Sequence, residues 1–228
     1  GKINHNEFVE MIKKSCTKLP IGNSNNREKA NYVSGEYREE KKLEQIHLLL
    51  GFEGIDYHHD DYYSLLVFSS LLGGGMSSRL FQEIREKRGL VYGIQSFSSS
   101  YSDTGIFAIY CGTGEKQIKE LIPVLCDELN NSPSSISEQE INRGKKSLKA
   151  SLMMSRESSN TRCRSAANHL LNFNRIIEPS ETLSKIDAVS KESVERIAKQ
   201  IMKGKITISS IGPIKNLEKV EQIQSRLN

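Results

Sequence analysis

The chain has 228 residues, of which 36% are apolar and 26% charged, with a formal net charge of +4. This size and composition support one substantial core or two small ones, and they exclude a largely disordered chain. Basic and acidic residues alternate in runs such as 38–42 and 83–88. We therefore expect solvated helix faces and no nucleic-acid partner.

No apolar run reaches the roughly 20 residues that a membrane-spanning helix needs. The first residues also lack the basic and then apolar pattern of a signal peptide. The four cysteines lie far apart, without the spacing of a metal cluster or of a small disulfide framework, which indicates a reducing compartment such as the cytoplasm. Because the sequence opens at Gly1 without a methionine, we expect it to be a processed or excised part of a longer chain.

The first predicted helix runs from Asn6 to Leu19, with an apolar stripe that includes Phe8 and Ile12 and with Asn4 or Asn6 as its cap. Residues 22–30 are polar and weakly patterned, as in a linker. We place a domain boundary here. Residues 1–25 would be the end of a preceding domain and its linker, and residues 26–228 a second domain.

Residues 32–37 have extended character, and 43–52 form the best early strand, apolar enough on both faces to be central in a sheet. We interpret His47, within that strand, as a core or sheet-face histidine and not as a ligand. Asp60 or Asp61 is expected to cap a helix over 62–72. We interpret the adjacent His58 and His59 as an exposed loop pair, because zinc on one helix needs histidines three or four residues apart.

Gly73, Gly74 and Gly75 follow a helix, and no Gly-Lys-Ser/Thr comes after them, so they are not a phosphate loop. They are either a pliable junction between helices, with Ser77 or Ser78 as the next cap, or a loop that contacts a ligand. Residues 78–87 read as a short helix closed by Gly89. Two strands of an antiparallel hairpin follow at 90–100 and 106–112.

The rest of the chain is mainly helical, with one strand and one further amphipathic helix at its end. Altogether this pattern predicts an α+β fold: a two-layer domain with a mixed, mainly antiparallel sheet and helices packed on it. The expected helices are 116–130, 137–158, 160–172, a short one after Pro179, 190–202 and 217–227, and the last strand is 206–211.

The stretch LGGGMSSRLFQEIREKRGLVY at 72–92, followed by SYSDTG at 100–105, resembles the C-terminal half of the inverzincin metallopeptidases. These are pitrilysin, insulin-degrading enzyme and the mitochondrial processing peptidases, and the match is closest to the bacterial processing-peptidase type. Weaker similarity extends it to about residues 32–213, through HLLLGFEG at 47–54, a run ending at Ser158 and IDAVS at 186–190. Family members often have glycine where Asn174 stands, and asparagine tolerates the left-handed conformation.

The resemblance implies a processing-peptidase-like fold and half of a zinc metallopeptidase. The zinc motif H-x-x-E-H is absent from this sequence, so we expect zinc in a missing N-terminal half and none bound here. Alone, the chain is predicted to be inactive. With that catalytic half as partner, it would cover a peptide or presequence substrate in a clamshell chamber, where Arg85 and Tyr92 stabilise the tetrahedral intermediate and Gly73 to Gly75 contact substrate.

Two other hypotheses stay open. The chain could be a zinc-free scaffold or recognition subunit of a processing-peptidase-like complex, or a thiol- or metal-dependent enzyme built on its own cysteines and histidines. The first helix, without its usual neighbour, would expose an apolar face and favour self-association as a homodimer. The resemblance also implies a bacterial cytoplasm or an organellar matrix.

Overall fold

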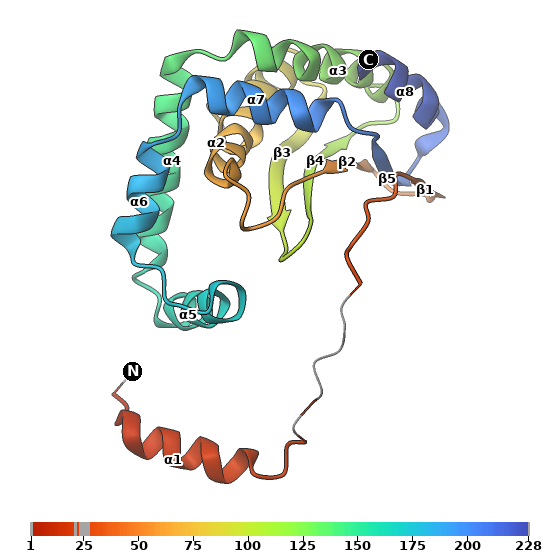
Figure 1. Cartoon of the computed structure of the whole chain (residues 1–228). Helices are drawn as coiled ribbons and strands as arrows, with labels where there is room; N and C mark the ends of the chain where they lie inside the picture. Colours follow the sequence, from red (N-terminus) through yellow and green to blue (C-terminus); the bar gives the residue numbers. More distant parts are fainter. Residues whose placement is uncertain (1, 21, 23–27, 228) are drawn as a thin grey trace.

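The structure is a computed structural model and describes residues 2–20, 22 and 28–227. Its centre is a five-stranded sheet in the order β1-β5-β2-β4-β3 (Figure 1). The strand bounds are Glu36–Glu40, Ile46–Glu53, Val91–Ser100, Gly105–Thr113 and Thr207–Gly212 for β1 to β5. β1 pairs with β5 in parallel and the other neighbours are antiparallel, which confirms the mixed, mainly antiparallel sheet.

One face of the sheet carries the core. In β2, Ile46, Leu48, Leu50 and Phe52 are buried, whereas His47 between them is exposed on the opposite face. This alternation follows from the two-residue period of a strand with one buried face. The strand is also central, because β5 and β4 flank it. The helices therefore form the second layer of an α+β domain, as the sequence predicts.

The helical layer begins with α2 (Tyr62–Gly73), which packs on β3, and α7 (Lys191–Met202), which packs on α2 and β2. α3 (Ile118–Ser135) lies against α7 and against α8 (Val220–Leu227). The Phe68 ring of α2 meets the Phe107 ring of β4 at a centroid distance of 5.6 Å. α4 (Glu138–Ser155) and α6 (Pro179–Asp187) pack on α2 and on each other, the 3-10 turn η2 (Ile214–Asn216) contacts β1, and α5 (Ser159–Phe173) has no buried residue.

Local signals in the sequence set most helix starts. Ser137 accepts a hydrogen bond from the Glu140 N–H in a capping box that begins α4, and Ser190 does the same with Ser193 in α7. Asn174 ends α5 with φ 54°, the left-handed conformation that asparagine tolerates. Asp61, however, does not cap α2 with its carboxylate. Its oxygens accept bonds from Arg196 of α7 at 2.9 and 2.5 Å, and this pair ties α2 to α7.

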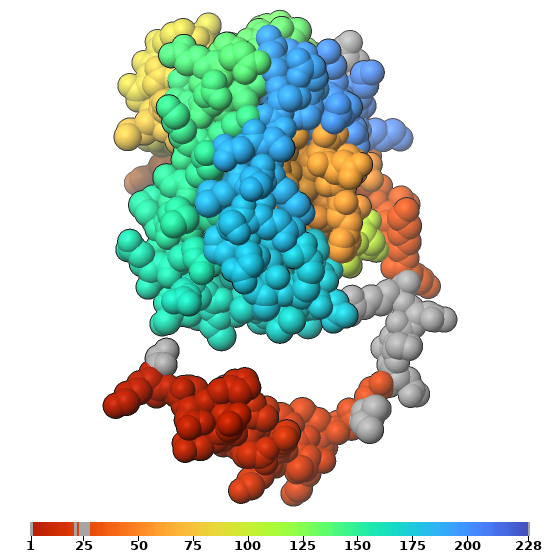
Figure 2. All heavy atoms as spheres, turned by 60° about the vertical axis from the view of Figure 1, so that its left-hand side comes forward, coloured from red at the N-terminus to blue at the C-terminus, as the bar shows by residue number. Residues whose placement is uncertain are grey.

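α1 (His5–Cys16) stands apart from the domain, below α5 in the view of Figure 1 and at one end of the molecule (Figures 1 and 2). Asn4 caps it by accepting bonds from the N–H groups of Asn6 and Glu7. None of its residues is buried, and within residues 2–20, 22 and 28–227 no hydrogen bond or ion pair joins it to another element. Most of the predicted linker lies outside the described residues.

Candidate functional site

The three glycines differ in what surrounds them. A Cβ added to Gly73, which is buried at the end of α2, would lie 2.4 Å from the Ser96 nitrogen of β3, and one on Gly74 would lie 2.6 Å from the Ser70 backbone. Close packing therefore requires both residues to be glycine. Gly75 has open space around its Cβ position, so packing does not explain it. Substrate contact by this loop stays a prediction.

Arg79 fixes the helix that follows the glycines. Its Nε and Nη2 donate to the two carboxylate oxygens of Glu140 at 2.5 and 2.8 Å, and its other donors reach the hydroxyl and carbonyl of Ser135. Burial of Glu140 opposes ionisation, but the bonds from Arg79 and from Ser137 outweigh it and lower the pKa of Glu140 to about 2. Ser78, expected as a cap, donates its hydroxyl to the Gly75 carbonyl instead.

The helix itself, η1 (Phe81–Glu86), is wound as a π-helix. The Lys87 N–H bonds the Gln82 carbonyl five residues back at 3.0 Å, and Leu90 N–H bonds the Ile84 carbonyl. Gly89 has φ 62° and closes the turn, as predicted. π-helical turns are rare and are frequent at functional sites. This one packs on β3 and leads directly into it.

Arg85 and Tyr92 lie on either side of that turn, Arg85 in η1 and Tyr92 near the start of β3. The Arg85 guanidinium stacks over the Phe81 ring, with its carbon 4.6 Å from the ring centroid. The Tyr92 side chain is 64% exposed. In the described part of the chain neither side chain has a hydrogen bond or ion pair with another residue, so their donors are available to a ligand.

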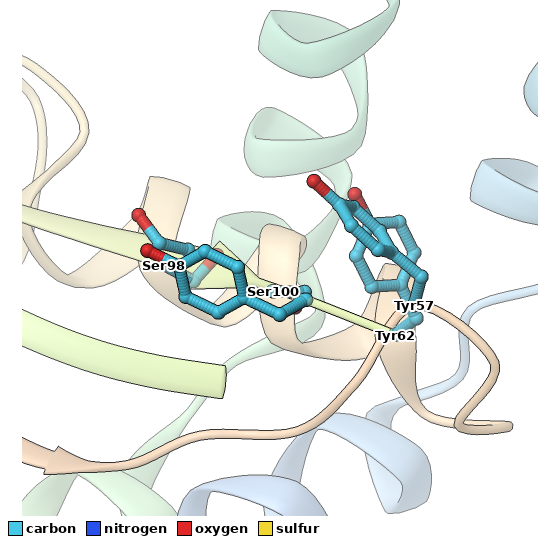
Figure 3. Close-up of a pocket in the computed structure, with 6 residues that line it drawn as sticks. Tyr57, Tyr62, Ser98 and Ser100 are labelled. Atoms are coloured by element: carbon cyan, nitrogen blue, oxygen red, sulfur yellow. The ribbon is translucent and has the colours of Figure 1, made fainter. Parts of the chain in front are cut away.

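β3 is an edge strand, and a hollow of about 290 Å³ lies at its far end (Figure 3). Tyr57, Tyr62 and residues 98–101 line it. Burial, reinforced by Tyr57 and Tyr63, raises the pKa of Tyr62 to about 12, so its hydroxyl stays a donor. Sequence reasoning missed this hollow, although the serine-rich run at 98–100 and its neighbouring tyrosines were a signal for it.

A larger cavity of about 1100 Å³ lies between α5 and the body of the domain. Tyr62 and Phe173 line it together with Arg156, Arg162 and His169. α5 has no buried side chain, and it lies across the far end of α4 (Figure 1). The aromatic contacts His58–Phe173 and Tyr57–Phe173, at centroid distances of 5.2 and 6.1 Å, join the loop before α2 to the end of α5.

His47 lies on a sheet face and His58 in an exposed loop, as predicted, but His59 is half-buried. His47 is on the exposed sheet face, where its Nδ1 lies 2.7 Å from the Tyr110 hydroxyl, and His59 accepts a bond from the Asp61 N–H at 3.0 Å. Burial raises the pKa of Cys111 and of Cys126 to about 12, which disfavours the thiolate that zinc requires. Among the described residues no group of three potential ligands is gathered, so they do not fit a zinc site.

The profile of the peptidase M16 inactive domain matches residues 1–148. The chain belongs to the peptidase M16 family, as its C-terminal domain. An uncharacterized zinc protease of Bacillus subtilis (strain 168), YmxG, is 35% identical over 198 residues, which are 86% of this chain and 48% of that protein. A zinc protease of Rickettsia felis is 33% identical over 93% of the chain and 52% of its own length.

The beta subunit of the human mitochondrial-processing peptidase is 28% identical to this M16 domain over all of the chain and 49% of the subunit. In a structural comparison, a chain of complex III2 from Candida albicans matches the whole of this chain over 57% of its own length, with a TM-score of 0.87 and 23% sequence identity. The two share a fold. The M16 domain thus spans about half the length of its curated relatives. No helix among its described residues is long and apolar enough to cross a membrane.

Proposed function

We propose that this M16 domain is the substrate-covering half of a zinc metallopeptidase and that Arg85 and Tyr92 stabilise the transition state of peptide hydrolysis. The observation that carries the proposal is that the π-helix η1 and the strand β3 that follows it present a guanidinium and a phenol with all their donors unengaged by described residues. The zinc-protease relatives support the reaction class.

The two side chains suit that role chemically. A guanidinium carries five N–H donors and no acceptor, and a phenolic hydroxyl can also donate. When water adds to a peptide carbonyl, negative charge develops on its oxygen, and donors already in place stabilise the charge as it forms. Loss of one such donor typically lowers kcat by about a hundred- to a thousandfold. Arg85 and Tyr92 would supply two of them.

Zinc and the activation of water would belong to an N-terminal half that carries H-x-x-E-H, since the described residues of this chain do not fit a zinc site. That half, in the same polypeptide or in a second chain, is the proposed partner. An extended peptide is the proposed substrate. The free edge of β3, which starts beside Tyr92, offers unpaired backbone groups to such a peptide.

We also assign residues 1–25 to the preceding domain and 26–228 to the substrate-covering domain. The exposed apolar side chains of α1, with Phe8 44%, Met11 62% and Ile12 45% exposed, support this division, because they would pack on the N-terminal half. Without that half the same face would favour self-association. Sedimentation of the chain with and without residues 1–25 would measure the association state of each. The same association state for both would contradict the role given to the α1 face.

The test of the proposed function is cleavage of a peptide library by the chain alone, by an N-terminal half bearing H-x-x-E-H, and by the two together. We expect zinc-dependent cleavage only from the combination, and a large loss with Arg85→Ala or Tyr92→Phe in it. Cleavage by the chain alone would overturn the assignment.

Unchanged cleavage with both variants would instead favour the alternative function, a zinc-free scaffold or recognition subunit. In that case the chain would contribute binding surface, and the two donors would have no part in the chemistry. If cleavage is lost instead, binding of an uncleaved peptide to the combination, measured for the same variants, separates a loss of chemistry from a loss of folding.

A further inference from the structure

The basic side chains in and around η1 are held in two different ways. Arg79 pairs with Glu140, and Lys87 and Arg88 both pair with Glu83. Arg85 has no carboxylate partner among the described residues, and its guanidinium lies over the Phe81 ring, 4.6 Å from the centroid. One cation of the group is therefore oriented by an aromatic ring.

An aromatic ring and a carboxylate have different effects on a guanidinium. A carboxylate takes up the N–H donors and neutralises the charge. A ring attracts the cation through its face and leaves the donors, which lie in the guanidinium plane, unused. Stacking on Phe81 thus orients Arg85 and keeps both its charge and its hydrogen-bonding capacity for a ligand.

The Phe81 ring is held in the hydrophobic core. Phe81 is 8% exposed and belongs to the hydrophobic core. The helix that carries it is fixed at its start by Arg79 on Glu140, and at its end by the N–H bonds of Gly89 and Leu90 to the carbonyls of Arg85 and Ile84. Phe81 and Arg85, four residues apart on this π-helix, are therefore held by the same packed turn.

We propose that Phe81 is a positioning residue, whose ring holds the Arg85 guanidinium in the orientation that meets the substrate carbonyl. The proposal rests on the proposed function of Arg85 and deepens it. It predicts that removing the ring impairs the chemical step even though Arg85 is still present.

The first measurement concerns the stack itself and uses the chain without any partner. In nuclear magnetic resonance spectra, protons of a side chain above an aromatic face move upfield. We expect this shift for the Arg85 side chain in the unmodified chain and its loss in Phe81→Leu. Arg85 signals at the same position in both proteins would overturn the stacked geometry.

The second measurement is kinetic and uses the chain combined with the H-x-x-E-H half. A cation–π contact of ordinary strength predicts that Phe81→Leu lowers kcat by about two- to thirtyfold with little change in KM. In a chain that already carries Arg85→Ala, Phe81→Leu should have no further effect. Phe107→Leu is the matched control, because Phe107 is a buried core ring that packs at a tilt against Phe52 and Phe68 and lies under no arginine that the structure describes.

The outcomes separate the two proposals. If Arg85→Ala is strongly impaired and Phe81→Leu is equally harmful with and without Arg85, the ring acts only through stability. The positioning role is then overturned and the proposed function stands. If Arg85→Ala cleaves normally, the proposed function fails and the role of Phe81 fails with it, whatever the spectra show.

Discussion

Arg79 and Arg85 lie six residues, about one and a half helical turns, apart, and their donors have opposite roles. The Arg79 side chain is 14% exposed, and its N–H groups donate to Glu140 and Ser135. These bonds join the start of η1 to the end of α3 and the start of α4. Arg85 rests on a ring and offers its donors outward. Hydrogen bonds already formed within the protein stabilise the fold, whereas donors left unengaged beside a fixed scaffold are available for function.

The largest effect that tests this contrast is expected from Arg85→Ala. Loss of a donor aimed at the developing oxyanion should lower kcat by about a hundred- to a thousandfold in the assembled peptidase. The free energy of unfolding of the chain should change by less than about 0.5 kcal/mol, as for other exposed sites. Steady-state cleavage assays and urea denaturation measure the two quantities, and a clear loss of stability without loss of kcat would reverse the assignment.

Arg79→Ala should give the opposite profile. It leaves the Glu140 carboxylate, which is 16% exposed, without its bidentate partner, and we expect a loss of about 2 to 3 kcal/mol in the free energy of unfolding. Arg88→Ala is the matched control, since its pair with Glu83 is more exposed and should contribute about 0.5 kcal/mol. Equal losses in urea denaturation would contradict the anchoring role.

The glycine loop offers a similar contrast within three residues. Gly73→Ala places a Cβ 2.4 Å from the Ser96 nitrogen, and such overpacking should destabilise the chain by about 1 to 3 kcal/mol. Gly75→Ala meets no atom within 4 Å and should leave stability within about 1 kcal/mol of the original. Thermal unfolding of both variants checks this. If Gly75→Ala also impairs cleavage, the loop contacts substrate.

A last test concerns acid stability. The pKa of Glu140 falls from 4.5 to about 2 in the folded chain, so this carboxylate stabilises the fold fully above pH 4.5. That contribution should be lost progressively as the pH decreases from 4.5 to 2. Glu140→Gln should lack this part of the pH dependence. Parallel curves of unfolding free energy against pH for the two proteins would show that Glu140 contributes nothing to it.

Much of the fold could be predicted from local patterns. The apolar run at 43–52 predicted β2 and its central place in the sheet, and the helices predicted from 137 and from 190 begin at capping boxes of Ser137 and Ser190, because such signals depend on nearby residues in the chain. The prediction for Asp61 was wrong. Its carboxylate was expected at a helix start, but Arg196, 135 residues away, binds it instead, and no local pattern contains that competitor.

The candidate site was predictable only in part. The ungapped stretch around Arg85 and Tyr92 identified the family, and Gly89 correctly ended the helix. The π-helical winding was missed, and so was the stack of Arg85 on Phe81, although the two residues are only four positions apart, because spacing alone does not fix where a guanidinium lies. The Ser and Tyr hollow was missed because its lining comes from segments about 40 residues apart.

The sequence by itself determined the order of strands and helices, the family and the two residues on which the proposed function depends. Only the tertiary structure decided that Arg79, just before η1, would have its donors bound and that Arg85, within η1, would keep its donors free of described partners. The reason is that Glu140, the partner of Arg79, lies 61 residues further along the chain, so that folding alone brings it to one arginine and leaves the other on an aromatic ring.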